Sequence, residues 1–432
     1  MSAQSLTRTT FFTGASKGIE GLGSVLATLI VARYLGPAGY GVYAQVVSTV
    51  MLLWPLVDMG LDHVIVRELV AGARKEAVVG SALALRLGAG LLLSCGLTGW
   101  VLINRPEGEL MAALALAITN ILLIRQVSNL ICRAFFLGIE RVENDLVATA
   151  AAQVVRVGGL LMASRQDWGL LGVLSVPIAA ELVQIALGMA LARRYLSIRR
   201  LQVFTSTVRR LVDQSWPILL RLVLITAYFH VDNVILAKLL SPGDLGLFAA
   251  PFRLVAGVVS VVVPTAWALL PSIVRNTGNP ASSRVMGRVG SLASGATGAV
   301  GAAFVLAAWP LVRLTFGADY DAGSAVACLR LLSMLPVLHT VAYIMELELL
   351  AAGRQQWALV AAAPALVAKV ILDLGLAEAL GPLTGAVSSV AADVLRVILL
   401  VGVTRSRWMV GASVPIVGLG VLVAASLLGG FR

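Results

Sequence analysis

Long apolar stretches, separated by short polar loops, occupy almost the whole chain. Each holds about 20 residues or more, the length that an α-helix needs to cross the hydrocarbon core of a membrane. Twelve such stretches lie at residues 11–35, 40–66, 78–103, 110–137, 145–163, 169–192, 215–240, 244–273, 285–316, 323–350, 357–376 and 381–403. A further run at 410–428 is a candidate for one more span. The pattern predicts an all-α polytopic membrane protein.

The composition agrees with this pattern. Hydrophobic residues make up 59% of the 432 residues and charged residues 13%, against roughly 25% charged in a soluble domain. A net charge of +11 would suggest nucleic acid as a partner of a soluble protein. Here the basic loops of a membrane protein explain most of that charge, so we expect no nucleic-acid partner. The cysteines and histidines lie apart in sequence, and we expect no metal site.

Basic residues in the loops predict the orientation of the helices. They gather after the even-numbered spans, from Arg67 to Arg74 after the second and from Arg193 to Arg210 after the sixth. The alternate loops hold few, such as Arg105. Because cytoplasmic loops carry the excess of positive charge, the N-terminus is predicted to be cytoplasmic, in a multi-pass protein of the cell (inner) membrane.

One stretch of the chain occurs twice. YLGPAGYGVYA at 34–44 returns as LLSPGDLGLFA at 239–249, which aligns Pro37 with Pro242 and Gly41 with Gly246. The offset is 205 residues, about half the chain, and indicates a duplicated unit. An even number of crossings separates the copies, so the repeats are parallel. We predict two parallel six-helix lobes around a central cavity.

A polar, arginine-rich stretch divides the chain near its middle. We predict an N-terminal lobe at residues 1–200, a cytoplasmic amphipathic linker at 201–214, a C-terminal lobe at 215–405 and a candidate additional helix within 406–432. Apolar residues between the arginines favour a basic helix on the cytoplasmic leaflet, where anionic lipid would hold it. The alternative is a flexible tether.

The first copy of the repeat also carries a family resemblance. LGPAGYGVYAQVVSTVMLLWPLVDMGLDHVIVREL resembles the second-helix region of polysaccharide flippases of the multidrug/oligosaccharidyl-lipid/polysaccharide exporter superfamily. GLFAAPFRLVAGVVSVVVPTAWALLPSI, LTFGADYDAGSAVACLRLLSMLP and AAGRQQW resemble the same family. The resemblance implies a flippase rather than an enzyme. Its cargo would be a polyprenyl-diphosphate-linked oligosaccharide, moved from the cytoplasmic to the outer leaflet by alternating access.

This interpretation implies partners and leaves alternatives open. The partners would be the lipid-linked glycan, membrane lipids, and a glycan polymerase or glycosyltransferases of the same pathway. One alternative is a cation-coupled multidrug exporter of the same fold, which would favour carboxylates over cations in its lumen. Another is a membrane glycan polymerase or ligase. The short outward loops argue against it, because its catalytic side chains would need a substantial loop.

Charged residues inside the spans are the candidate cargo-binding residues. A charge at the bilayer centre costs about 2.5–3.5 kcal/mol, so it needs a partner or a hydrated cavity. Lys17 and Glu20 belong to a polar stripe with steps of three and four residues, which predicts a helix face that lines the lumen. The alternative is a buried pair that only packs helices. Arg221 lies close to the corresponding position of the second repeat, and two such cations would suit a diphosphate.

Arg253 is the leading candidate for anion binding. It lies nine residues after Asp244, too deep in its span to reach the interface easily. The family resemblance implies a lumen arginine at this place, and the alternative is an ion pair with a membrane carboxylate. Arg86 and Arg125 are further candidates within spans.

Carboxylates inside the spans are candidates for coupling to H⁺ or Na⁺, and we expect no other cofactor. The candidates are Asp373, Glu346 and Asp232. The alternative is a structural role as counter-ions. The spacing would allow Lys369 to pair with Asp373, and Asp393 with Arg396, along one helix.

Overall fold

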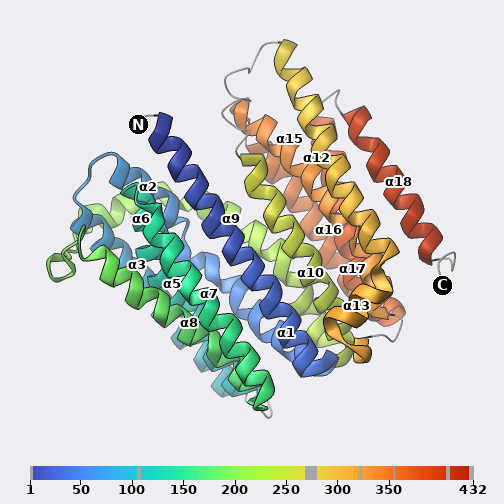
Figure 1. Ribbon diagram of the computed structural model, residues 1–432, viewed down its shortest axis with the longest axis horizontal. Coiled ribbons are helices and arrows are strands. Elements are labelled where there is room, and N and C mark those ends of the chain that lie inside the picture. Colours follow the sequence, from blue (N-terminus) through green and yellow to red (C-terminus); the bar gives the residue numbers. More distant parts are fainter. Residues whose placement is uncertain are drawn as a thin grey trace. The chain divides into compact units, whose positions relative to one another are not determined.

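Helices make up nearly all of the part of the chain that the computed structural model describes, residues 3–104, 109–267, 280–320, 324–354, 356–404 and 409–427. These residues contain no strand (Figure 1). Ten of their helices are long and apolar enough to cross a membrane. Two further helices, Gly290–Leu306 and Ala308–Phe316, meet at an angle of 77°. If this bent pair forms one span, the described residues contain eleven candidate spans. The predicted all-α polytopic membrane protein is confirmed.

The elements follow one another in a simple order. The first half contains α1 (Ala3–Asp58), α2 (Leu61–Val70), α3 (Lys75–Asn104), α4 (Leu110–Ile118), η1 (Thr119–Ile124), α5 (Arg125–Ser128), η2 (Asn129–Phe135), α6 (Phe136–Gly138), α7 (Val142–Arg165), α8 (Gly169–Ala192) and η3 (Ile198–Arg200). The second half contains α9 (Thr205–Leu239), α10 (Pro242–Trp267), α12 (Pro280–Leu306), α13 (Ala308–Phe316), η4 (Ala318–Tyr320), α14 (Ser324–Leu332), α15 (Leu335–Ala351), α16 (Gln356–Leu380), α17 (Leu383–Thr404) and α18 (Met409–Leu427).

The first predicted span and most of the second lie on either side of a break within the element α1. Its only break is at Gly36, where φ is 64° and ψ is −179°. Residues with a side chain rarely adopt a positive φ, so glycine suits this position. Pro37 lacks the backbone N–H that would continue the helical hydrogen bonds. This break lies at the Pro-Gly stretch between the first two predicted spans, so α1 consists of two helices that are joined there. A second break at Met59 and Gly60, both with positive φ, separates α1 from α2.

The chain forms two compact units whose boundaries cut through helices. Unit 1 comprises Met1–Val31 and Gln45–Val231, and unit 2 comprises Ala32–Ala44 and Asp232–Arg432. The kinked middle of α1 thus belongs to unit 2, and most of α9 belongs to unit 1. The predicted division at the central linker would instead put the whole of α1 in the first lobe and nearly all of α9 in the second.

The central linker is shorter than predicted and is attached to unit 1. Helix α9 already begins at Thr205, so only residues 201–204 are non-helical. The backbone N–H of Gln202 donates to the carbonyl of Glu76 at 3.3 Å, and the N–H of Phe204 donates to Ser81 Oγ at 3.3 Å. Gly80 permits this approach, because a Cβ there would lie 2.5 Å from the carbonyl oxygen of Gln202. The stretch predicted as a separate amphipathic helix is a strap against α3 that continues into α9.

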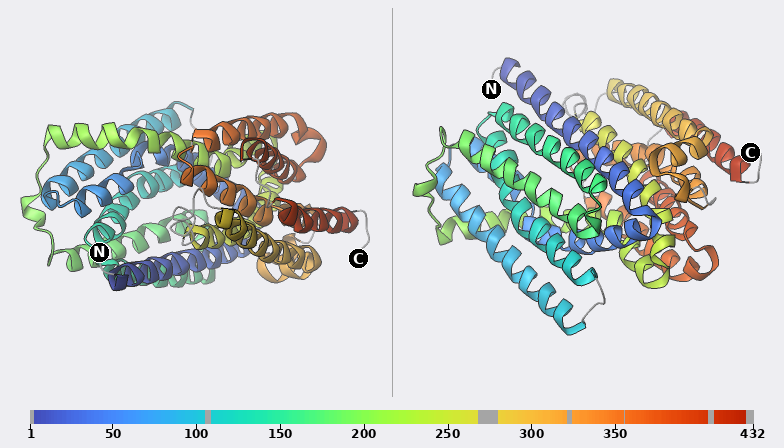
Figure 2. Two further views of the ribbon diagram at one scale, coloured as in Figure 1. Left: turned by 90° about the horizontal axis from the view of Figure 1, so that it is seen from above. Right: turned by 60° about the horizontal axis from the view of Figure 1, so that its bottom comes forward.

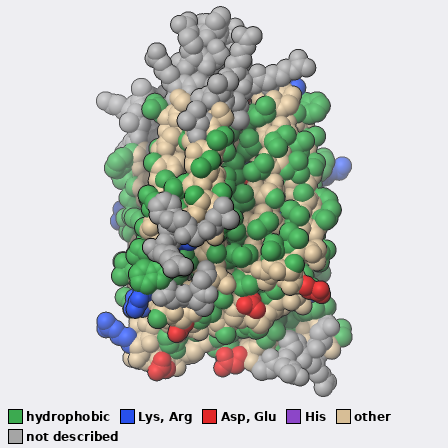
Figure 3. All heavy atoms as spheres, turned by 90° about the vertical axis from the view of Figure 1, so that its right-hand side faces the viewer, with side chains coloured by type: hydrophobic (Ala, Val, Ile, Leu, Met, Phe, Trp, Pro, Cys, Tyr) green, Lys and Arg blue, Asp and Glu red, His purple; other side chains and the backbone are tan. Residues whose placement is uncertain are grey.

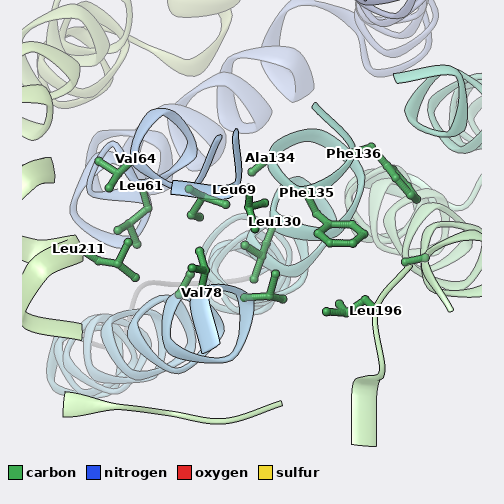
Figure 4. Close-up of a cluster of buried hydrophobic side chains, with 14 residues drawn as sticks. Leu61, Val64, Leu69, Val78, Leu130, Ala134, Phe135, Phe136, Leu196 and Leu211 are labelled. Carbon is green, nitrogen blue, oxygen red and sulfur yellow. The ribbon is translucent and has the colours of Figure 1, made fainter. Parts of the chain in front are cut away.

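An apolar cluster holds the α2 end of unit 1 together (Figure 4). It joins side chains from α2, α3, η2 and α6 with Leu196 and Leu211 from either side of the linker. Phe135 and Phe136, both fully buried, have ring centroids 5.6 Å apart. Packing of this kind fixes the helix that carries several charged side chains of the site described below.

In unit 2, α15 is the central helix. Most of its side chains are buried, and it packs against α10, α12 and α17. Hydrophobic side chains cover much of the face shown in Figure 3, whereas its described acidic side chains gather near one end. That distribution suits a surface in contact with lipid.

Candidate functional site

Unit 1 contains a cluster of charged side chains within its apolar helices, which we call the arginine network. The first part of α1 lies along α7 (Figure 2). Ser16 Oγ of α1 donates a hydrogen bond to Asp145 Oδ2 of α7 at 2.7 Å. Other members come from the α5–η2 segment and from α8. The network consists of Lys17, Glu20, Arg125, Arg133, Asp145, Arg156 and Glu181.

Glu20 is the common anion of three cations. Its carboxylate lies 2.9 Å from Lys17 Nζ, 3.0 Å from Arg133 Nη2 and 3.6 Å from Arg125 Nη2. About a third of its side chain is exposed, as is a similar share of the three cations. This side of the network is therefore open enough for a ligand to reach. The Lys17–Glu20 pair that the sequence offered as an alternative to a lumen-lining face is present, but it is part of a larger arrangement and is partly exposed.

The other two carboxylates of the network lie deeper. Glu181 Oε1 is 3.1 Å from Arg156 Nη2 and 3.9 Å from Arg125 Nη1, and its side chain is only 5% exposed. Asp145 accepts hydrogen bonds from Ser16 and from Thr149. These groups are held by several partners each, which favours a fixed structural role for them.

The helix that supplies Arg125 and Arg133 is irregular. Its α-helical turns alternate with the π-helical segments η1 and η2, and Arg125 begins the short α turn between them. Wide π turns within α-helices are frequently found at functional sites. Arg133 lies close to the predicted cytoplasmic end of the span 110–137 and was not among the predicted binding residues. The spacing of four between Arg125, Asn129 and Arg133 was the available signal.

The space inside the network is small. A cavity of about 20 Å³ lies among the charged groups, which is room for about one water molecule. A phosphate group would not fit there unless a side chain moved. The cations of the network are thus satisfied by internal carboxylates in this structure.

Arg86 was predicted to bind cargo, which requires an accessible side chain. Its side chain is fully buried, and Nη2 lies 2.7 Å from Asp58 Oδ1 and 2.6 Å from Asp62 Oδ1. Nη1 donates to the carbonyl of Gln126 at 3.3 Å. Asp58 also accepts the backbone N–H of Gly60, so these contacts join α3 to the α1–α2 break. The placement favours a structural role.

Arg221 and Arg253 have the surroundings expected of free cations. Both side chains are exposed, and no ion pair joins either to another described residue. The alternative considered for Arg253, a pair with a membrane carboxylate, is not seen among the residues the structure describes. Arg221 lies on α9 in unit 1 and Arg253 on α10 in unit 2.

The coupling candidates Asp232 and Asp373 meet in unit 2 around a buried lysine. Lys369 Nζ lies 2.8 Å from Asp232 Oδ2 and 5.6 Å from the centroid of the Phe252 ring. Ser389 Oγ donates to Asp232 at 3.2 Å, and Ser388 Oγ to Asp373 at 2.5 Å. Lys369 thus forms its ion pair with a carboxylate on α9, and it also interacts electrostatically with Asp373, the partner expected from helical spacing.

This buried group carries one more carboxylate than cations. Asp232 Oδ1 and Asp373 Oδ2 are both buried and accept no hydrogen bond from another described side chain, and the two carboxyl groups interact with each other. Two carboxylates beside one ammonium leave a formal charge of −1, which a proton or another small cation would neutralise. The arrangement is chemically suited to the predicted coupling role.

Glu346, the third coupling candidate, is already paired. Arg396 of α17 donates to its carboxylate through Nε and Nη2, and both side chains are mostly buried. Close by in sequence, His339 Nδ1 lies 2.5 Å from Asp393 Oδ2, a pair that the sequence analysis did not find. The expected Asp393–Arg396 pair is replaced by these two contacts between α15 and α17. Glu346 therefore has the environment of a structural counter-ion.

The comparisons with known proteins agree with this architecture. A family model described as "Polysaccharide biosynthesis protein" matches residues 6–277. The chain belongs to this family. No curated protein sequence matches it.

Solved transporter structures share the fold. A multidrug resistance MATE family transporter of the MOP superfamily, in an inward-facing conformation, is 14% identical with a TM-score of 0.71, over 94% of this chain and 95% of that one. The lipid II flippase MurJ, in an inward closed conformation, is 12% identical with a TM-score of 0.70, over 98% and 93%. A MOP superfamily transporter from Pyrococcus furiosus, described as having a binding pocket of reverse polarity, is 14% identical with a TM-score of 0.56, over 98% and 96%. The protein has the fold of MOP superfamily transporters and flippases.

Proposed function

We propose that this protein is a flippase that moves a polyprenyl-diphosphate-linked oligosaccharide from the cytoplasmic to the outer leaflet by alternating access. The observation that carries the proposal is the charge of the arginine network. Four cations, Lys17, Arg125, Arg133 and Arg156, share three carboxylates inside apolar helices. Such an excess of cations is costly in a membrane and suits an anionic ligand.

Family membership supports this choice of cargo. The matched family is one of polysaccharide biosynthesis, and one protein of the same fold is a lipid II flippase. Arg221 in unit 1 and Arg253 in unit 2 are exposed cations, and each remains a candidate for anion binding within its own unit. A glycan polymerase or glycosyltransferases of the same pathway would supply or consume the cargo. The loop charges support a cytoplasmic N-terminus in the cell (inner) membrane.

A second function, cation-coupled export of drugs, has one observation in its favour. The Asp232–Lys369–Asp373 group carries an excess carboxylate, as a proton- or sodium-coupled exporter would require. The same group would serve a flippase that uses an ion gradient, so it does not by itself favour the drug exporter.

Reconstitution separates the two functions. The purified protein in liposomes is supplied with a short polyprenyl-diphosphate-linked sugar, and a membrane-impermeant reagent measures how much of it reaches the other leaflet. We expect translocation above that of protein-free liposomes, and no uptake of a cationic dye in parallel vesicles. Dye transport without movement of the lipid-linked sugar would favour the exporter and contradict the proposal.

A further inference from the structure

Glu20 differs from the other carboxylates of the arginine network in its position and partners. It is the only one of the three that contacts Lys17 and Arg133, and it is about a third exposed, whereas Glu181 is 5% exposed. Glu181 has Arg156 as a close partner, and Asp145 has two hydroxyl donors. Removal of Glu20 would therefore take away the ion-pair partner of Lys17 and Arg133, and would leave Arg125 with Glu181 at 3.9 Å.

We propose that Glu20 is a resident counter-ion in an anion-binding site, and that it becomes protonated and gives up its ion pairs when a phosphate-type ligand binds Lys17, Arg125 and Arg133. This inference rests on the proposed function, and it concerns how ligand binding to the arginine network is controlled. The cavity of about 20 Å³ holds no phosphate group while Glu20 occupies its place between the cations.

The formal charges match the exchange. With Glu20 ionised, four cations and three carboxylates give the network a charge of +1. With Glu20 neutral, the charge is +2, the opposite of the two negative charges of a diphosphate diester. Lysine and arginine side chains at hydrogen-bond distance from a carboxylate are equally suited to phosphate oxygens.

The exchange couples anion binding to a proton. The charged groups that face Glu20 are Lys17 of α1, Arg125 of α5 and Arg133 of η2, with Asp145 of α7 and Glu181 of α8 behind them. Protonation of Glu20 removes a negative charge that repels the ligand. By linkage, an anion bound to the same cations favours the protonated form of Glu20, so binding takes up a proton.

Calorimetry on the purified full-length protein tests the inference, with sulfate as the probe because its charge does not change near neutral pH. We expect Glu20→Gln to bind sulfate about ten-fold more tightly than the wild type, since one repelling charge is gone. Wild-type affinity should rise as the pH falls, with uptake of one proton per sulfate, measured in buffers of different ionisation enthalpy. Affinity of Glu20→Gln should not depend on pH. Inorganic diphosphate should show the same order of affinities.

Two control variants keep the result interpretable. Glu346→Gln removes a carboxylate from another intramembrane ion pair and should bind sulfate as the wild type does. Glu20→Asp keeps the charge on a shorter side chain and should show intermediate affinity with the pH dependence retained. Proton uptake by the wild type needs no variant, so it remains a test even if Glu20→Gln folds poorly.

The results distinguish failure of this inference from failure of the proposed function. Equal sulfate affinity of wild type and Glu20→Gln, or binding without proton uptake, overturns the inference even if the reconstituted protein translocates its lipid-linked sugar. Absence of sulfate and diphosphate binding in every variant also overturns it. If sulfate binds with the expected pH dependence but no lipid-linked sugar moves, the counter-ion role stands and the proposed cargo is wrong.

Discussion

Gly41 and Gly246 each lie against the backbone of the other repeat. A Cβ on Gly41 would lie 1.8 Å from the carbonyl oxygen of Pro242, and a Cβ on Gly246 would lie 1.9 Å from that of Pro37. Gly41 corresponds to Gly246 in the duplicated stretch and Pro37 corresponds to Pro242, and each of these two pairs is separated by 205 positions. The two turns that the sequence relates are therefore in direct and reciprocal contact within unit 2.

This contact leads to a first prediction. Gly41→Ala and Gly246→Ala should each lower the free energy of unfolding by about 1–3 kcal/mol, because the added methyl group meets backbone atoms that cannot rotate away. Thermal unfolding of the purified variants measures the change. Gly243→Ala is the control, since a Cβ there would have no neighbour closer than 3.8 Å. Equal melting temperatures of all three variants and the wild type would contradict the close contact.

A second prediction concerns Arg86. Arg86→Gln leaves Asp58 and Asp62 without their shared cation and should cost about 3–5 kcal/mol of stability. The double variant Arg86→Gln/Asp58→Asn should recover part of the loss. Arg67→Gln, which changes an exposed arginine of α2, serves as the control. Membrane abundance and thermal unfolding are the measurements.

The same variant distinguishes a structural role for Arg86 from cargo binding. If Arg86 is structural, the protein that still folds should transport at nearly the wild-type rate per molecule. Normal abundance combined with loss of transport would instead favour the cargo-binding role that the sequence suggested.

A third prediction concerns Arg253. Arg253→Ala should reduce translocation of the lipid-linked sugar about ten- to hundred-fold, the range expected when one charge-assisted contact is lost. Its abundance should not change, because the side chain is exposed. Arg253→Lys should keep part of the activity, since the charge remains while the planar guanidinium is lost. Arg165→Ala, another exposed arginine near the end of a span, should behave as the wild type. Full transport by a well-expressed Arg253→Ala would remove this assignment.

A fourth prediction concerns ion coupling in unit 2. Asp373→Asn removes the excess negative charge but leaves the Lys369–Asp232 pair, so the protein should fold. If this group binds the coupling ion, the variant's transport should no longer respond to a proton or sodium gradient across the liposome. Glu346→Gln should keep the response, because Glu346 is held by Arg396. An unchanged response in Asp373→Asn would show that the carboxylate is structural.

The sequence by itself determined the class of fold and several of its parts. Apolar stretches of about 20 residues or more have few alternatives to spanning helices, because a backbone in lipid must satisfy its own hydrogen bonds. The repeat was visible because Pro37 and Gly41 recur as Pro242 and Gly246. Charges such as Lys17 and Asp373 were identifiable as candidates because they are costly within apolar helices.

Only the tertiary structure decided which of these charges meet. Helical spacing suggested Lys369 with Asp373 and Asp393 with Arg396, but Lys369 pairs with Asp232 and Arg396 with Glu346. Glu20 and Arg133, which lie 113 residues apart in sequence, are hydrogen-bonded. A charge that is buried between helices interacts most strongly with the partner that packing brings closest, in surroundings of low dielectric constant. That partner comes from a neighbouring helix, and spacing along one helix carries no information about it.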